Sequence, residues 1–427
     1  QRRVHGDCCA MRLILVAAVL GVALATRVSY EGYKVLRFNP TEEQLKLLNN
    51  FSNRPGFDFW NEPRKYGGNL DIMVSPAQLP SFLAYLKENH VSFTVLNENV
   101  QTLIDAEIRH QETAPKTPRA ISFDQYYRYS EINAYLEELA VKFPDIVSLE
   151  SIGRSYEGRD MVVIKISSGG GGARPVVLVD GGIHAREWIA PAMTLYIINQ
   201  LVENSTANTA LTDAVDWYIL PVLNPDGYEY SHTNDRLWRK SRSLTTTTTQ
   251  RCYGIDQNRN WDFHWMENGA SSNPCDETYA GEEPLSEVEN RNFRDFVDTH
   301  RDRIKLYLTF HSYGEYLLYP WGYTSALPSD WRILQDLAEE VDAAQVAAGG
   351  NPFDIGTSTN VLYAAAGGSD DYMKGVEGID LSYTVELTNT RYGFELPASQ
   401  ILQYVRQFFE GVRVFGTYVK DNFSAKA

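Results

Sequence analysis

The sequence predicts an α/β protein with a mixed central sheet flanked by helices, preceded by a small α/β domain of the open-sandwich type. Its 427 residues exceed the usual size of one small domain, so one large and one small domain are expected. After residue 122, short apolar runs alternate with helical segments, which is typical of a sheet buried on both faces. A polar, Pro-rich stretch at 113–119 separates the two parts. We therefore expect domain limits of 26–119 and 120–427.

The amino-terminal end has the features of a secretory signal peptide. Met11-Arg12 precedes an apolar run over 13–20, and Ala23-Leu24-Ala25 closes it. The run is too short to span a bilayer. We expect residues 1–25 to be leader and signal peptide, with translated leader ahead of Met11. We also expect the product to be secreted and not to bind membranes.

The small domain shows a strand and helix alternation. Helix starts are indicated by Thr41-Glu42-Glu43 and Ser75-Pro76, which place acidic residues or proline in the first turn. A polar helix follows the last strand. Strands are expected over 33–38, 69–74 and 91–96, and helices over 41–51, 76–89 and 97–112.

The large domain places polar residues where apolar runs end. Ligands of such sheets bind beyond the carboxyl ends of the strands. His184 and His311 follow two of these runs and Glu386 lies near the end of a third, which predicts a site at the mouth of the sheet. Strands are expected over 162–166, 176–181, 217–223, 306–311 and 381–387, and helices over 130–142, 189–203, 286–299, 331–347 and 397–420.

Charge and cysteine usage restrict the partners and the compartment. A net charge of −16 argues against nucleic acid and anionic membranes, since both attract basic patches. Cys8 and Cys9 lie in the leader, so Cys252 and Cys275 form an even pair in an exported protein. A disulfide is expected, with two buried free thiols as the alternative. Sequons begin at Asn50, Asn204 and Asn422.

His184, Glu187 and His311 have the spacing of a catalytic zinc site. Two close ligands and one distant ligand leave the fourth position for water or substrate. A single histidine after a strand more often makes an ordinary hydrogen bond, so the combination carries the prediction. From the residues alone, Asp256 is either an acceptor that fixes the tautomer of a ligand histidine or a surface acid.

Hydrolysis at an open zinc site needs a base, and Glu386 is the best candidate. A carboxylate inside an apolar strand is costly unless it is paired or functional, and a buried ion pair is the alternative. Arg236, Arg239 and Arg259 have the chemistry to capture a carboxylate or stabilise an oxyanion. Considered singly, each would be a surface residue.

Together these motifs resemble the zinc metallocarboxypeptidases of the pancreatic A/B type in their zymogen form. The resemblance covers about residues 30–420 in several separate blocks. It implies a carboxypeptidase-like catalytic domain with one zinc per chain. It assigns the metal to His184, Glu187 and His311, with Asp256 as the partner of the first zinc histidine, the base to Glu386 and carbonyl polarisation to Arg239. For the substrate, it assigns the clamp on the terminal carboxylate to Asn258 and Arg259, a supporting subsite to Arg236 and the cover over bound substrate to Tyr363. It also implies a disulfide between Cys252 and Cys275.

The resemblance also implies that residues 26–119 are a prodomain that shields the active site. A trypsin-like protease would cut at Lys116 or Arg119 and release the enzyme. The expected partners are peptide and protein C-termini, this activating protease and protein inhibitors of carboxypeptidases. The resemblance also implies a monomer with a digestive role.

Asp370 predicts a preference for C-terminal Lys or Arg. It stands where B-type enzymes have an aspartate and A-type enzymes an apolar residue, and an unpaired buried carboxylate would reject apolar ends. Gly322 and Ser358 stand where the mammalian B pattern has serine and glycine, so the small polar lining is exchanged between two walls. The alternatives are an A-type preference for aromatic or aliphatic ends, and a catalytically silent peptide-binding protein, although Glu386 and Arg239 are both present.

Overall fold

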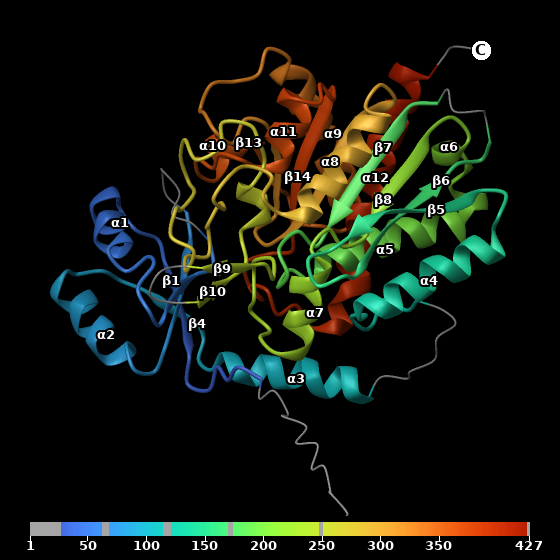
Figure 1. Ribbon diagram of the computed structural model, residues 1–427. Coiled ribbons are helices and arrows are strands. Elements are labelled where there is room, and N and C mark those ends of the chain that lie inside the picture. The colour runs from blue at the N-terminus through green and yellow to red at the C-terminus, as the bar shows by residue number, and fades with distance from the viewer. Residues whose placement is uncertain (1–26, 62–67, 114–120, 170–173, 247–250, 425–427) are drawn as a thin grey trace, which may run out of the picture.

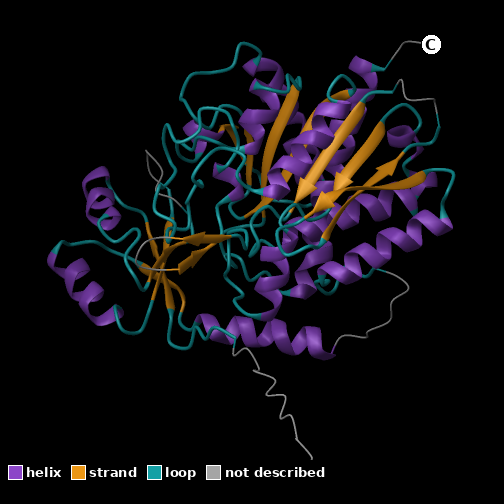
Figure 2. Ribbon diagram, in the orientation of Figure 1, coloured by secondary structure: helices purple, strands orange, loops and turns teal. Residues whose placement is uncertain are grey.

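The computed structural model describes residues 27–61, 68–113, 121–169, 174–246 and 251–424. These residues form a large body around an eight-stranded mixed sheet and a small body around a four-stranded sheet (Figure 1). Helices flank both sheets (Figure 2). The predicted α/β class with a mixed central sheet is confirmed.

Four parallel strands form the centre of the large sheet. In spatial order these are β14, β11, β7 and β8, and antiparallel partners extend the sheet on both sides. The carboxyl ends of the four central strands therefore meet at one edge. Across the sheet the strands are β13 (Asp354–Thr357), β12 (Tyr316–Tyr319), β14 (Leu381–Leu387), β11 (Ile304–Ser312), β7 (Val176–Gly181), β8 (Asp216–Leu220), β6 (Asp160–Ile166) and β5 (Val147–Arg154).

Helices cover both faces of the large sheet because its strands are apolar on both sides. Along β11, Leu306 and Leu308 enter one core and Tyr307 the other, as the period of two in a strand requires. The first core contains α4 (Tyr129–Lys142), α5 (Ile189–Val202), α9 (Trp331–Ala347) and α12 (Ile401–Phe423), and the second contains α8 (Val288–His300) and α11 (Ser369–Gly375). Shorter elements are α6 (Thr209–Thr212), α7 (Pro225–Thr233), α10 (Ser358–Val361) and the hairpin β9 (Leu244–Thr246) with β10 (Arg251–Tyr253).

The small body is an antiparallel sheet with two helices on one face. Its strands in spatial order are β2 (Phe57–Phe59), β3 (Leu70–Val74), β1 (Lys34–Phe38) and β4 (Thr94–Asn97), and its helices are α1 (Glu42–Asn49) and α2 (Leu79–Glu88). The opposite face shares a core with Leu237, Tyr313 and Phe394 of the large body. Helix α3 (Val100–Thr113) then runs along the large body, as Figure 1 shows. The small body therefore lies directly against the large one.

Several element limits differ from those predicted. Strand β8 ends at Leu220 rather than residue 223 because Pro221 has no N–H for the ladder. Helix α12 begins at Ile401 because a 3₁₀ turn over Ala398–Gln400 precedes it. The strand expected over 91–96 begins only at Thr94. The prediction missed β2, β5, β12, β13, α7 and α11, which are too short or too polar to carry a clear periodicity.

Two expectations concern segments outside the described residues. The signal peptide over 1–25 and the cleavage residues Lys116 and Arg119 all belong to these segments. Within the described ranges, no helix is both long and apolar enough to cross a membrane.

Candidate active site

His184, Glu187 and His311 converge at the carboxyl edge of the sheet. His184 and Glu187 occupy the turn between β7 and α5, and His311 is the last residue but one of β11. Gly182 adopts a positive φ of 64° at the start of this turn, a conformation that favours glycine. All three side chains are buried, and they form a group that could hold a metal ion.

The donor atoms of this group have the spacing of a tetrahedral metal site. Nδ1 of His184 lies 2.8 Å from Glu187 Oε1 and 3.2 Å from His311 Nδ1, which lies 3.1 Å from Glu187 Oε2. Ligand bonds of about 2.0–2.1 Å to zinc would separate the ligand atoms by about 3.3 Å. Two imidazoles and one carboxylate are also the donor set of catalytic zinc sites. The residues present therefore fit this ion.

Asp256 is buried beside His184 and is not a surface acid. Its Oδ1 lies 3.1 Å from His184 Nε2, and Arg239 donates to its Oδ2 from Nε at 3.1 Å and Nη2 at 2.8 Å. Burial raises the pKa of Asp256, but Arg239 and His184 outweigh burial and hold this pKa well below its ordinary value. The ionised carboxylate accepts a hydrogen bond from Nε2–H of His184, which leaves Nδ1 to face the metal position.

Glu386 lies next to the metal group on the neighbouring strand. It pairs in register with His311 across β14 and β11. Burial raises the pKa of Glu386 to about 8, with His311 and Arg239 opposing and Glu187 adding to the rise. A bound cation would lower this pKa, because positive charge favours the carboxylate. The arrangement supplies a carboxyl group able to exchange protons near neutral pH beside the metal position.

Asn258 and Arg259 lie on a 3₁₀ turn that Asp256 caps. Asp256 Oδ1 accepts from the Asn258 N–H at 3.0 Å. The Asn258 side-chain oxygen accepts from the N–H of Ser369 at 2.9 Å, and Arg259 Nε donates to the carbonyl of Gly269 at 2.8 Å. The Arg259 guanidinium carbon lies 5.8 Å from the centre of the Tyr363 ring. The structure thus brings Asn258, Arg259 and Tyr363 into one neighbourhood.

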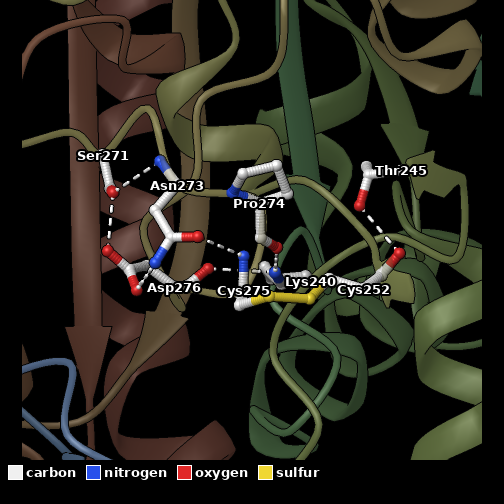
Figure 3. Close-up of a disulfide and its surroundings, with 8 residues drawn as sticks. All are labelled: Lys240, Thr245, Cys252, Ser271, Asn273, Pro274, Cys275 and Asp276. Carbon is white, nitrogen blue, oxygen red and sulfur yellow. Dashed lines mark hydrogen bonds between the residues drawn. A yellow bond between two sulfur atoms is a disulfide. The ribbon is translucent and has the colours of Figure 1, made fainter. Parts of the chain in front are cut away.

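A disulfide closes the loop that carries this turn. Cys252 and Cys275 are bonded with a Cα–Cα distance of 5.2 Å, so the expected bridge is confirmed. Figure 3 shows Lys240 beside it, donating at 2.9 Å to the carbonyls of both Pro274 and Asp276. These bonds tie the second half of the loop to the segment that carries Arg239.

Asp370, Ser358 and Gly322, the residues expected to set specificity, lie close to one another. Asp370 and Asp371 are buried at the start of α11. The hydroxyl of Ser358 donates to Asp370 Oδ2 at 3.1 Å. The N–H groups of Gly322 and Tyr323 donate to Asp371 at 2.8 and 2.9 Å. Asp371 therefore holds the backbone at Gly322 and Tyr323, whereas Asp370 contacts Ser358.

The guanidinium of Arg236 is bound by helix α3. Its Nε donates to Glu107 of α3 at 2.6 Å, and its Nη2 donates to the carbonyl of Phe394 at 2.7 Å. Its guanidinium also stacks on Trp188, with the carbon 3.7 Å from the ring centre. In this form of the protein, the Arg236 expected in a substrate subsite binds Glu107 of α3.

The sequence-based interpretation missed other residues that join the two bodies. Arg186, between two metal-site residues, donates to Asp58 at 3.0 Å. Tyr313 donates to Asp71 at 2.8 Å, and Arg37 donates to the carbonyl of Thr390 at 2.6 Å. The charged Asp71 inside the apolar strand β3 was the available signal, because such a residue needs a partner.

Comparisons with known proteins agree with this geometry. Residues 132–411 match the family model described as zinc carboxypeptidase, and residues 36–107 match the carboxypeptidase activation peptide. Carboxypeptidase B of Astacus astacus is 50% identical over 305 residues, 71% of this chain and 100% of that protein. The crystal structure of carboxypeptidase A from Helicoverpa armigera has a TM-score of 0.85 at 32% identity, covering 92% of this chain and 99% of that one. Bovine thrombin-activatable fibrinolysis inhibitor, solved with tick carboxypeptidase inhibitor, has a TM-score of 0.66 at 35% identity, covering 70% and 99%.

Proposed function

Because this chain belongs to the zinc carboxypeptidase family, we propose that it is a secreted exopeptidase that removes C-terminal Lys or Arg after its activation segment is cut. As a member of that family it is a metallopeptidase that hydrolyses C-terminal peptide bonds, and it carries an activation peptide. Three parts go further than this: the basic specificity, the roles of individual residues and the export.

The observation that carries the basic specificity is the buried carboxylate of Asp370. The residue is 6% exposed, and its carboxylate accepts a hydrogen bond from the Ser358 hydroxyl. Such a group at the base of a substrate pocket would pair with a terminal ammonium or guanidinium. An apolar side chain would leave the charge unpaired, so substrates with a basic C-terminal residue would be strongly preferred over substrates with an apolar one. The 50% identity with a carboxypeptidase B supports the same assignment.

The chain's own groups would divide the reaction among them. Arg259 and Asn258 bind the free carboxylate of the substrate, which restricts cleavage to the last bond. Glu386 removes a proton from the attacking water as the water oxygen bonds to the carbonyl carbon. Glu386 then delivers that proton to the leaving amine nitrogen as the C–N bond breaks. Arg239 donates to the oxygen that gains negative charge, since only part of its donor set is used by Asp256.

His184, Glu187 and His311 would hold the zinc. When bound, zinc acts as a Lewis acid that polarises the scissile carbonyl and lowers the pKa of water. Asp256 would keep His184 in the tautomer that offers Nδ1 to the ion.

Residues 26–119 would form the prodomain and its connector, with 120–427 as the catalytic domain. Ion pairs from Asp58 to Arg186 and from Glu107 to Arg236 support a shielding role, because Arg186 lies between two metal-site residues and Arg236 donates to its carbonyl. A trypsin-like protease would cut at Lys116 or Arg119. The product would act as a monomer on peptide and protein C-termini. Similarity to a protein solved with tick carboxypeptidase inhibitor supports inhibition by proteins of that kind.

The test is the rate of hydrolysis of hippuryl-Arg and hippuryl-Phe by trypsin-treated protein. We expect a strong preference for hippuryl-Arg. Replacing Asp370 by Ile should lower kcat/KM for hippuryl-Arg at least a hundredfold, because losing one partner of a buried charge pair costs about 3–5 kcal/mol and each 1.4 kcal/mol is about tenfold. The same change should raise activity on hippuryl-Phe.

Ser358→Ala is the matched control, because it removes one hydrogen bond to Asp370 and leaves the charge. It should cost about tenfold or less on hippuryl-Arg. Asp371 is unsuitable as a control because it binds the N–H groups of Gly322 and Tyr323. Wild-type enzyme that prefers hippuryl-Phe would contradict the basic specificity and leave the family assignment intact.

A further inference from the structure

A buried polar group on the strand before the metal site has no role in the proposed reaction. Asp180 is fully buried in β7, four residues before His184. Among the described residues, no Lys or Arg forms an ion pair with it. A carboxylate without a cation inside a strand is costly, so its hydrogen-bond partners show what it is used for.

Strand register brings Asp180 near the Nε2 side of the His311 ring, which faces away from the metal position. Tyr307, Thr309 and His311 alternate along β11 and therefore share one face of the sheet. Asp180 is the register partner of Thr309 on β7. The Thr309 hydroxyl lies 2.9 Å from Asp180 Oδ1 and 3.2 Å from His311 Nε2, and the Tyr307 hydroxyl donates to Asp180 Oδ2. A continuous chain thus runs from the carboxylate to the metal-site histidine.

The direction of this chain follows from what each group can donate. An ionised carboxylate only accepts, so the Thr309 hydroxyl donates its one proton to Asp180. The hydroxyl oxygen can then only accept from His311, which places the ring proton on Nε2. Nδ1 is left with its lone pair towards Glu187 and His184.

We propose that Asp180 and Thr309 are positioning residues that lock His311 in the Nε2–H tautomer and thereby prepare its Nδ1 for the metal. Asp256 does the same for His184 by direct contact, whereas Asp180 acts through one hydroxyl. Tyr307 holds the second oxygen of Asp180 and fixes its rotamer. This inference rests on the metal site of the proposed function.

Zinc affinity of the full-length protein is the first measurement, by competition with a chelator of known affinity. Thr309→Val keeps the shape of the side chain and removes the hydroxyl. It should weaken zinc binding by about 10–100-fold, the usual range for a partner of a metal ligand. Thr309→Ser restores the hydroxyl and should bind within about threefold of wild type. Thr194→Val is the matched control, because Thr194 is also fully buried but donates to Pro191.

The tautomer of His311 is the second measurement, by nitrogen NMR of the metal-free protein labelled only at histidine. Wild type should show the His311 proton on Nε2. In Asp180→Asn, the amide NH₂ can donate to Thr309, whose hydroxyl can then donate to Nε2 and move the ring proton to Nδ1. We therefore expect a shift to the Nδ1–H form with weaker zinc binding.

The outcomes separate this inference from the site on which it rests. Unchanged zinc affinity in Thr309→Val, or an unchanged tautomer in Asp180→Asn, would overturn the positioning role. If Thr309→Val does not fold, Asp180→Asn still decides the question. A wild-type protein that binds no zinc, or a Glu187→Ala variant that binds it normally, would instead refute the metal site itself.

Discussion

At the scale of single residues, the metal group and the base are separable. Replacing Glu386 by Gln should keep one zinc per chain, because Glu386 is not among the three converging ligands. Turnover should fall by about 10²–10⁴-fold, the usual contribution of a general base. Metal analysis and kcat on a C-terminal Arg substrate check both. Glu187→Ala is the counterpart that should lose the metal, and a Glu386→Gln enzyme with near-normal kcat would exclude Glu386 as the base.

Glu395 gives a residue-scale prediction about pH. Burial raises the pKa of Glu395 to about 8 from its ordinary value near 4.5, with Arg236 opposing and Glu107 adding to the rise. The folded protein then binds more protons than the unfolded chain between these values, so Glu395 makes stability fall as pH rises from about 4.5 to 8. Neither of its carboxylate oxygens has a hydrogen-bond partner in the described structure.

Glu395→Gln should therefore stabilise the uncut protein at pH 8.5 and change little at pH 4. The gain should be a few kcal/mol, since each unit of pKa difference is worth about 1.4 kcal/mol. Urea-unfolding midpoints at the two pH values measure it. Some pH dependence should remain, because burial also raises the pKa of Glu289 to about 8. A variant with the same midpoint as wild type at pH 8.5 would show that Glu395 finds a partner on ionisation.

At the scale of elements, the disulfide loop joins stability to substrate binding. Cys252 and Cys275 are 23 residues apart and enclose Asn258 and Arg259. Replacing both cysteines by Ser should cost about 3 kcal/mol of unfolding free energy in the chain-entropy model. KM should rise more than kcat falls, because the loop holds the carboxylate clamp and not the base. Denaturant unfolding and steady-state kinetics test this, and an unchanged KM would separate the bridge from the clamp.

The elements also show which parts of the fold are readable from the sequence. The long central strands were found because β7 and β11 are apolar on both faces. The edge strands β12 and β13 were missed because four residues carry too little periodicity. The metal ligands were readable because strand ends and close spacing mark them. The chain Asp180–Thr309–His311 was not readable, because it depends on the register between β7 and β11, which only the tertiary structure supplies.

At the scale of the whole molecule, an apolar core and ion pairs join the amino-terminal part to the large body. The face of the small sheet opposite α1 and α2 packs on Leu237, Tyr313 and Phe394. The ion pairs Asp58–Arg186 from β2 and Glu107–Arg236 from α3 tie these two elements to the large body. On the proposed shielding role, a substrate reaches the metal site only after these contacts open. Uncut protein should therefore show little activity on short peptides, and trypsin should release it.

Glu107→Gln tests this interlock directly. The change leaves the Arg236 guanidinium buried without its counter-charge, and breaking such a pair typically costs about 3–5 kcal/mol. Each 1.4 kcal/mol lost from docking raises the open fraction about tenfold, so basal activity of the uncut protein should rise at least about a hundredfold. Activity after trypsin should equal that of wild type, because Glu107 leaves with the activation segment.

Glu42→Gln is the control. It breaks the exposed ion pair with Lys46 in the small body, which is worth under about 1 kcal/mol, so basal activity should stay low. Equal basal activity in the Glu107→Gln and Glu42→Gln variants would mean that the apolar face alone keeps the small body in place.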